Sequence, residues 1–103
     1  IADISIYHKF WSAITGQKMS RSEFLKAGER IHILERYMNT REGITIKDDT
    51  LPRRFLKEGR KNDPKGRVVP LEEMRKKYYH IRSYDDNGKP TARIMKKLAI
   101  QIH

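Results

Sequence analysis

The chain contains no cysteine. This absence excludes disulfide bridges, a thiolate nucleophile, a cysteine-ligated zinc site and any iron–sulfur cluster bound by the chain's own thiolates. No apolar run approaches the roughly 20 residues that a helix needs to cross a bilayer, so we expect a soluble chain without membrane contact. Because residue 1 is Ile rather than Met, we expect a processed or excised piece of a longer protein.

Acidic residues are few relative to basic ones. The 103 residues include 23 Lys and Arg against 13 Asp and Glu, which gives a formal net charge of +10. Such a charge is compatible with nucleic-acid binding. The positive residues occur in every segment, however, and no expected helix shows the basic, base-reading face of a helix-turn-helix. The pattern therefore favours solvated or partner-facing charge, with nucleic-acid binding as the alternative.

Apolar residues recur at spacings of three and four, which predicts amphipathic helices. Ser20 and Glu23 fit a capping box at the start of the longest helix. Gly28 lies in line with the apolar face of that helix, so we expect the first helix to cross close to it. In the last helix, apolar residues are expected to point inward. The expected helices cover residues 3–14, 20–39, 52–56, 71–81 and 90–98.

The remaining segments predict irregular connections. Residues 59–66 have no apolar side chain and form an expected solvated loop. Asp49 or Thr50 is expected to cap the short helix that begins near Pro52. The fold class is therefore all-α, a small irregular bundle of four to five helices with a long loop between the second and third long helices. The length predicts one domain, residues 1–103.

Two groups of residues could carry chemistry. Glu29 and His32 have the spacing of a di-iron helix motif, but such a site needs a second copy and two further carboxylates from other helices, and none of the other histidines has a Glu at that spacing. Asp48 and Asp49 are an adjacent carboxylate pair, for which helix capping is a simpler explanation than acid–base catalysis. No Gly-rich phosphate loop, nucleophile elbow or metalloprotease helix is present. We therefore expect no catalysis from these residues alone.

Polar residues concentrate near the end of the second helix. Arg36 or Arg41 could form a bidentate ion pair with Asp48 or Asp49 and hold the following loop against the helix. The alternative is a solvated face of unpaired charges. The polar residues of this group are Arg30, Glu35, Arg36, Asn39, Arg41 and Glu42.

Short motifs occur in a defined order along the chain. Gly-Glu-Arg-Ile begins at Gly28, Asn-Thr-Arg-Glu-Gly at Asn39, and Asp-Asp-Thr-Leu-Pro at Asp48. A Tyr-Tyr block from Tyr78 to Asp85 follows. From about residue 14 to residue 100, the chain resembles the C-terminal domain of the aldehyde ferredoxin oxidoreductases. Ile33 stands where the family often has Asn, and Ser83 and Ala99 stand where Gly is usual, which affects local hydrogen bonding and turn geometry.

The resemblance implies an oxidoreductase that holds tungsten or molybdenum in a pterin cofactor near a 4Fe-4S cluster and passes electrons between an aldehyde and ferredoxin. It also implies a helical fold. The cluster's cysteine ligands and the pterin-contacting segments have no counterpart here, so no catalytic, cofactor-binding or metal-binding residue is assigned. The matching residues are instead assigned to folding and domain packing: Gly28, Glu29, Arg30, Glu35, Arg36, Asn39, Arg41, Glu42, Gly43, Asp48, Asp49 and Pro52.

Two functions remain as hypotheses. The first is that the chain is the C-terminal helical part of a cytoplasmic aldehyde ferredoxin oxidoreductase-like enzyme and is inactive alone. Its partners would be the remainder of that enzyme and, as a candidate, ferredoxin. The second is a basic binding module for nucleic acid or for an acidic protein.

Overall fold

The structure, a computed structural model, describes residues 3–101, and over this range it consists of five helices joined by irregular connections. The all-α prediction is confirmed, and each helix begins and ends within two residues of its expected bounds. An isolated antiparallel bridge joins Tyr84 and Pro90 before the last helix. The helices are α1 (Ile4–Thr15), α2 (Arg21–Arg41), α3 (Arg53–Lys57), α4 (Leu71–Arg82) and α5 (Ala92–Lys97).

Local sequence signals set the ends of the two N-terminal helices. Gly16 closes α1 in the left-handed conformation with φ 72°. The capping box at α2 is confirmed: the Ser20 hydroxyl accepts from the Glu23 N–H at 3.1 Å, and the Glu23 carboxylate accepts from the Ser20 N–H at 3.0 Å. These reciprocal bonds fix where α2 starts without any tertiary contact.

The hydrophobic core is small and lies where α2, α4 and α5 meet. Ile33 of α2 is fully buried, and the expected inward orientation of Met95 and Leu98 at α5 is confirmed. Tyr79 of α4 and Tyr84 in the turn after it complete the buried cluster. Partly buried Tyr37, Ile46, Ile94 and Ile100 pack around it. This core fixes the relative positions of α2 and α4, which carry the polar site described below.

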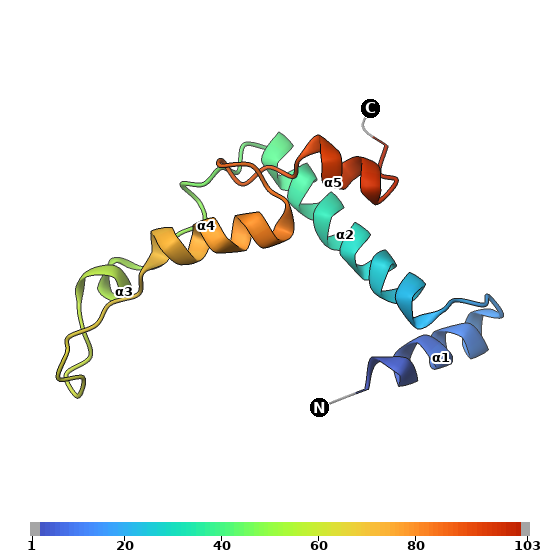
Figure 1. The fold of residues 1–103 in the computed structure, drawn as a ribbon, viewed down its shortest axis with the longest axis horizontal. Coiled ribbons are helices and arrows are strands. Elements are labelled where there is room, and N and C mark those ends of the chain that lie inside the picture. Colours follow the sequence, from blue (N-terminus) through green and yellow to red (C-terminus); the bar gives the residue numbers. More distant parts are fainter. Residues whose placement is uncertain (1–2, 102–103) are drawn as a thin grey trace.

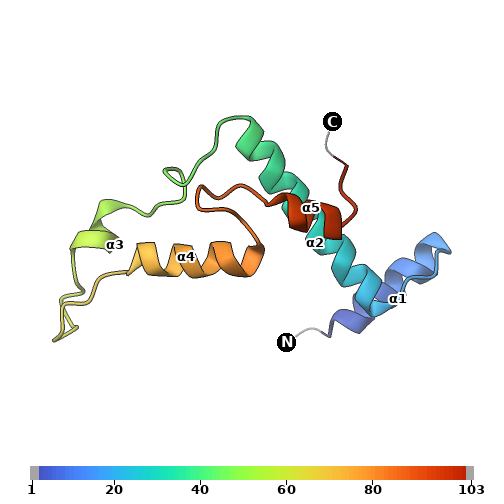
Figure 2. The ribbon, with the colours of Figure 1, turned by 45° about the horizontal axis from the view of Figure 1, so that its top comes forward.

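The molecule is elongated, with principal extents of 55 × 37 × 19 Å. Figure 1 shows α1 and α3 at opposite ends, with α2 and α4 diverging from the core between them. Both Figure 1 and Figure 2 place α5 beside α2. The radius of gyration is 18.4 Å, against about 13 Å for a compact domain of this length. The chain therefore folds around a junction rather than closing into a sphere.

Large apolar side chains remain exposed along three helices. Ile14 of α1 is 81% exposed, Ile31 of α2 is 67% exposed and Ile81 of α4 is 77% exposed. The periodic stripes therefore identify the helices correctly, but most of each stripe lies uncovered within this chain. Over residues 3–101, no helix has the length and apolarity required to span a bilayer.

The expected close crossing at Gly28 is wrong. A Cβ atom added at Gly28 would meet nothing within 4 Å. The first helix instead contacts the start of α2, where the rings of His8 and Phe24 lie 6.4 Å apart between centroids. The glycine leaves an open surface on α2 because α1 crosses about one turn earlier.

Candidate functional site

A polar network beside the core joins α2, α4 and the two connections that face them. The Arg36 guanidinium forms a bidentate ion pair with the Asp49 carboxylate, with Nη1 donating to Oδ1 at 2.9 Å and Nη2 donating to Oδ2. The Arg36 Nε donates to the Gly88 carbonyl at 2.8 Å. Tyr79 donates its hydroxyl proton to Asp49. We call Arg36, Asp49, Tyr79, Arg75 and Gly88 the Arg36 network.

Arg75 completes this network by binding the loop backbone. Its Nη1 donates to the carbonyl oxygens of Ile46 at 3.2 Å and Asp49 at 2.9 Å. The segment after α2 is thereby held from both sides, by Arg36 through its carboxylate and by Arg75 through its backbone. The sequence-based ion pair is confirmed, with Arg36 and Asp49 as the partners.

The pKa values of these groups are shifted further away from neutral pH, so their ionisation states do not change near neutrality. The hydrogen bonds from Arg36 hold the pKa of the Asp49 carboxyl below its usual range, despite partial burial. The same interaction raises the pKa of the Arg36 guanidinium. Burial, followed by the bond to Asp49, raises the pKa of the Tyr79 hydroxyl to about 12. A charged pair with a permanently protonated tyrosine suits a structural clamp rather than proton transfer.

Gly88 is required by the geometry of this network. Its φ of +82° is left-handed, and a Cβ atom there would lie 2.8 Å from the Tyr79 hydroxyl oxygen and closer still to the Arg36 guanidinium. Aromatic faces also border Arg36, whose guanidinium carbon lies 5.3 Å from the Tyr84 ring centroid. A side chain at position 88 would displace the arginine from its carboxylate.

Three further contacts tie α2 to the C-terminal elements. Arg82 of α4 donates from Nη1 to both carboxylate oxygens of Glu29, at 2.8 and 2.9 Å. Arg30 donates from Nε to the Leu98 carbonyl at the end of α5, at 2.8 Å. His32 Nε2 lies 3.2 Å from the Tyr84 hydroxyl. Glu29 and His32, the residues with di-iron spacing, thus have separate protein partners.

The structure distributes the other predicted site residues differently. Capping of α3 by Asp49 or Thr50 is wrong, because Pro52 occupies the N-cap without a side-chain bond and Asp49 turns toward Arg36. Asp48 instead accepts from the Thr45 N–H at 2.8 Å. Gly43 adopts a φ of +105° in the turn after α2. The side chains of Glu35, Asn39, Arg41 and Glu42 are exposed.

Tyr79, Arg75, Gly88 and Arg82 are the contributors to the site that residue-level reasoning did not place. Tyr79 belongs to a recognisable Tyr-Tyr block, but its neighbour Tyr78 is the one in line with the apolar stripe of α4. Asn87-Gly88 is a turn signal, which predicts the backbone conformation without predicting which side chain approaches it. Only the packing of α4 against α2 reveals these partners.

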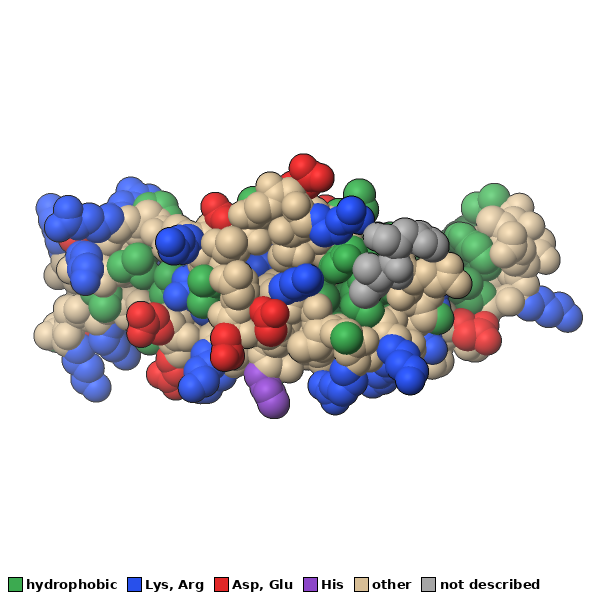
Figure 3. Space-filling view, turned by 90° about the horizontal axis from the view of Figure 1, so that it is seen from above, with side chains coloured by type: hydrophobic (Ala, Val, Ile, Leu, Met, Phe, Trp, Pro, Cys, Tyr) green, Lys and Arg blue, Asp and Glu red, His purple; other side chains and the backbone are tan. Residues whose placement is uncertain are grey.

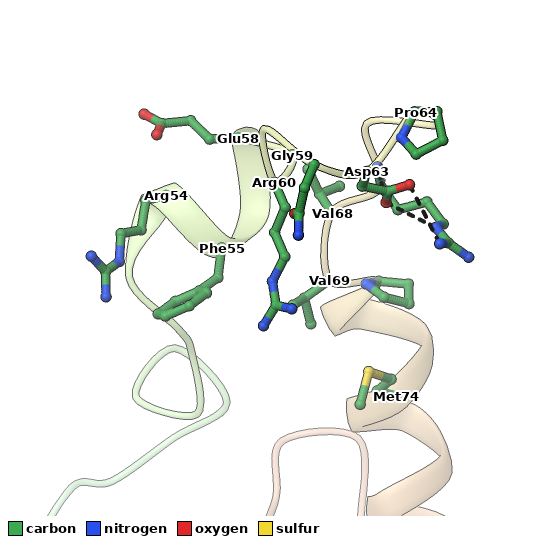
Figure 4. A pocket seen from close by; sticks show the side chains of 13 residues that line it. Arg54, Phe55, Glu58, Gly59, Arg60, Asp63, Pro64, Val68, Val69 and Met74 are labelled. Atoms are coloured by element: carbon green, nitrogen blue, oxygen red, sulfur yellow. Dashed lines mark hydrogen bonds and ion pairs between the residues drawn. The ribbon is translucent and has the colours of Figure 1, made fainter.

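A hollow of about 740 Å³ lies at the opposite end of the molecule from α1, between α3, the loop after it and the start of α4. Figure 4 shows Arg60 extending between Phe55 and Val69, while Glu58 points outward. The loop closes at its neck, since a Cβ atom at Gly59 would lie 2.6 Å from the Gly66 backbone. This hollow is open and basic, and it is separate from the Arg36 network.

The fold and its polar network define a helical unit whose connections are held together around Arg36. Residues 1–100 match the family model described as aldehyde ferredoxin oxidoreductase, domains 2 and 3. The tungsten-containing aldehyde ferredoxin oxidoreductase of Pyrococcus horikoshii is 38% identical over 97 residues, which cover 92% of this chain and 16% of the relative. The tungsten-containing aldehyde ferredoxin oxidoreductase of Thermococcus kodakarensis is 41% identical over 85 residues, which cover 81% of this chain and 14% of the relative.

The chain belongs to the aldehyde ferredoxin oxidoreductase family. It spans about a sixth of the length of the curated relatives it matches. The family resemblance inferred from the ordered motifs is therefore confirmed. Those relatives are described as oxidoreductases, which supports the enzyme-part hypothesis over a nucleic-acid-binding module.

The residues of this segment do not provide ligands that fit the cofactors implied by the family. The chain has no cysteine for an iron–sulfur cluster. Residues 3–101 also contain no group of three His, Asp or Glu side chains that could hold a metal ion.

Proposed function

We propose that this chain is the C-terminal helical part of a cytoplasmic, tungsten- or molybdenum-pterin-dependent aldehyde ferredoxin oxidoreductase, and that it stabilises and helps to close the cofactor site of the complete enzyme. In the proposed reaction, an aldehyde and water give a carboxylic acid, two protons and two electrons, and ferredoxin accepts the electrons. The cofactors would be held by residues outside this chain. The 103 residues act by packing.

The large uncovered apolar surface carries this proposal. The accessible surface is 8834 Å² for a chain of 12.2 kDa, whereas a compact monomer of that mass exposes about 6,100 Å². Exposed isoleucines on α1, α2 and α4 contribute to the excess. Apolar side chains exposed along several helices are typical of obligate interfaces, which bury more than about 2,000 Å² in total. The partner surface is the remainder of the parent polypeptide.

Complementation tests the proposal. The parent enzyme without this segment is mixed with the chain, and association is followed by size-exclusion chromatography and by aldehyde oxidation with ferredoxin. We expect a one-to-one complex with restored activity, while either part alone is inactive. Ile31→Lys combined with Ile81→Lys should prevent association, whereas the matched change Ser22→Lys, at an exposed position of α2, should not.

Two results would count against the proposal. Two folded parts that do not associate would remove the packing role. Association without recovery of aldehyde oxidation, when the uncut enzyme is active, would show that the segment packs without supporting the cofactor site.

A further inference from the structure

Positive charge concentrates in one part of the elongated molecule. Residues 53–67, which form α3 and the loop after it, contain seven Lys and Arg but only two acidic residues. This net charge of +5 is half of the chain's total of +10, carried by fifteen residues. Figure 3 shows Lys and Arg side chains gathered at the end of the molecule that carries α3 in Figure 1. We call residues 53–67 the basic lobe.

Most of this charge has no partner within the chain. Over residues 3–101, the ion pair formed by the lobe joins Arg67 Nε to Asp63 Oδ2 at 2.9 Å. The other lobe cations make no ion pair with described residues. Burying a cation without a partner is strongly unfavourable, because nothing compensates for the loss of its hydration. The apolar faces of α1 and α2 therefore suit the parent's interior, whereas the basic lobe suits its outer surface.

An apolar centre lies at the edge of the basic lobe, where α3 faces the start of α4. Phe55, Val68 and Met74 border the hollow and are 42%, 41% and 55% exposed. The Arg54 guanidinium carbon lies 4.7 Å from the Phe55 ring centroid, and Arg60 extends past the same ring (Figure 4). An exposed aromatic and aliphatic centre with arginines at its rim is the anatomy of a protein–protein interface.

The partner class follows from charge and from that apolar centre. A surface of net charge +5 attracts an acidic partner and accelerates association, with a strong dependence on salt. The phosphate backbone of a DNA duplex requires cations but gains nothing from Phe55 and Val68. A protein surface with carboxylates around an apolar spot matches both features.

We propose that the basic lobe is the docking surface for the acidic electron-carrier protein that exchanges electrons with the complete enzyme. The inference rests on the proposed function and adds the place of contact. Arg54 and Arg60 pair with carboxylates of the carrier, and Phe55 packs against its apolar centre. The hollow between α3 and the start of α4 receives one of its side chains.

Charge reversal in the complete enzyme tests the docking surface. The lobe variant carries Arg54→Glu, Arg60→Glu and Lys61→Glu. The matched variant carries Lys18→Glu, Lys26→Glu and Lys97→Glu, which are exposed positions outside the lobe and change the net charge equally. Steady-state rates are measured with ferredoxin and, separately, with a small dye as electron acceptor, at low and moderate salt.

The lobe variant should raise the KM for ferredoxin about tenfold or more at low salt, and this difference should shrink at moderate salt. The matched variant should change that KM less than twofold. The rate with the dye should be the same in all three proteins, because the aldehyde site is untouched.

Three outcomes would overturn the docking proposal. They are an unchanged ferredoxin KM in the lobe variant, an equal change in both variants, and lobe-dependent binding of duplex DNA with no effect on ferredoxin. Absence of aldehyde oxidation with any acceptor in the unmodified enzyme would instead overturn the proposed function, so the two failures are distinguishable.

Discussion

Arg36 connects more elements of this chain than its position on a helix suggests. From the C-terminal part of α2 it binds the Asp49 carboxylate after α2 and the Gly88 carbonyl after α4. Its side chain is 16% exposed and that of Asp49 is 29% exposed, so water screens the pair only in part. Its contribution to the free energy of unfolding should therefore be intermediate between those of a buried ion pair and a surface ion pair.

Arg36→Ala should lower the free energy of unfolding by about 2 kcal/mol, because it leaves a partly buried carboxylate and a carbonyl without their donor. Arg41→Ala should cost less than about 0.5 kcal/mol, since Arg41 is exposed on the last turn of the same helix. Thermal and urea denaturation monitored by circular dichroism would compare the two. Equal losses would contradict the assignment of the clamp to Arg36.

Ser83 and Ala99 store local backbone strain. They are the non-glycine residues with positive φ among residues 3–101, at 60° and 54°. The left-handed conformation costs a residue with a Cβ atom about 1–2 kcal/mol. Substitution by glycine removes this cost, but part of the gain is lost because glycine also increases the entropy of the unfolded chain.

Ser83→Gly and Ala99→Gly should therefore each raise the free energy of unfolding by about 0.5 kcal/mol. Ala92→Gly, in the first turn of α5, should lower it by up to about 1 kcal/mol, because that residue is helical. Denaturation midpoints of the three variants measure the difference. A loss of stability at both position 83 and position 99 would contradict the strain assignment.

At the scale of elements, the sequence specifies more about helices than about their partners. The capping box of α2 and the glycine after α1 are local signals, so they predict those ends correctly. By their distance along the chain, Arg36 and Arg41 are both candidates for the ion pair with the aspartates of the following loop, yet they lie on different sides of α2. Only the position of α4 selects Arg36. Tyr79 is missed for the same reason, since the stripe through Tyr78 faces outward in this chain.

Substitution of Gly28 tests whether the surface of α2 is uncovered at this position. Because nothing lies within 4 Å of a Cβ atom at this helical position, Gly28→Ala should raise the stability of the chain by about 1 kcal/mol. Gly88→Ala provides the opposite case, with a left-handed φ and a crowded site, and should be destabilising. Urea denaturation of both variants measures the signs. A destabilising Gly28→Ala in the isolated chain would contradict the open surface seen here.

The connection between α2 and α3 should respond to acid through Asp49. The pKa of this carboxyl is lowered by folding from its ordinary value of 3.8, so its contribution to stability is complete above that value. The contribution is lost as pH falls below about 4 and through the folded-state pKa. Asp49→Asn should be less stable at pH 7 and should flatten the acid dependence. Asp48→Asn, at an exposed neighbour, should retain it; identical acid profiles for the two variants would contradict the clamp.

At the scale of the whole molecule, the core and the apolar faces serve different partners. The core at the α2, α4 and α5 junction is complete within the chain. The exposed faces along α1, α2 and α4 contribute to the excess surface of this elongated molecule, whose extents are 55 × 37 × 19 Å. Half of the net charge of +10 lies in the basic lobe, and the other half is spread over the rest of the chain.

Two isoleucines on α2 allow packing in the core to be compared with packing against the parent protein, because the side chain is the same at both positions. Ile33 is fully buried in the core, so Ile33→Ala should lower the stability of the isolated chain by about 3 kcal/mol. Ile31 is 67% exposed, so Ile31→Ala should cost less than about 1 kcal/mol there. In the complete enzyme, where the parent covers α2, the cost of Ile31→Ala should rise toward that of Ile33→Ala. Urea denaturation of both variants in both contexts would measure this. An Ile31→Ala cost that stays the same in the complete enzyme would mean that the exposed face of α2 faces water there too, and that the packing role lies on α1 and α4.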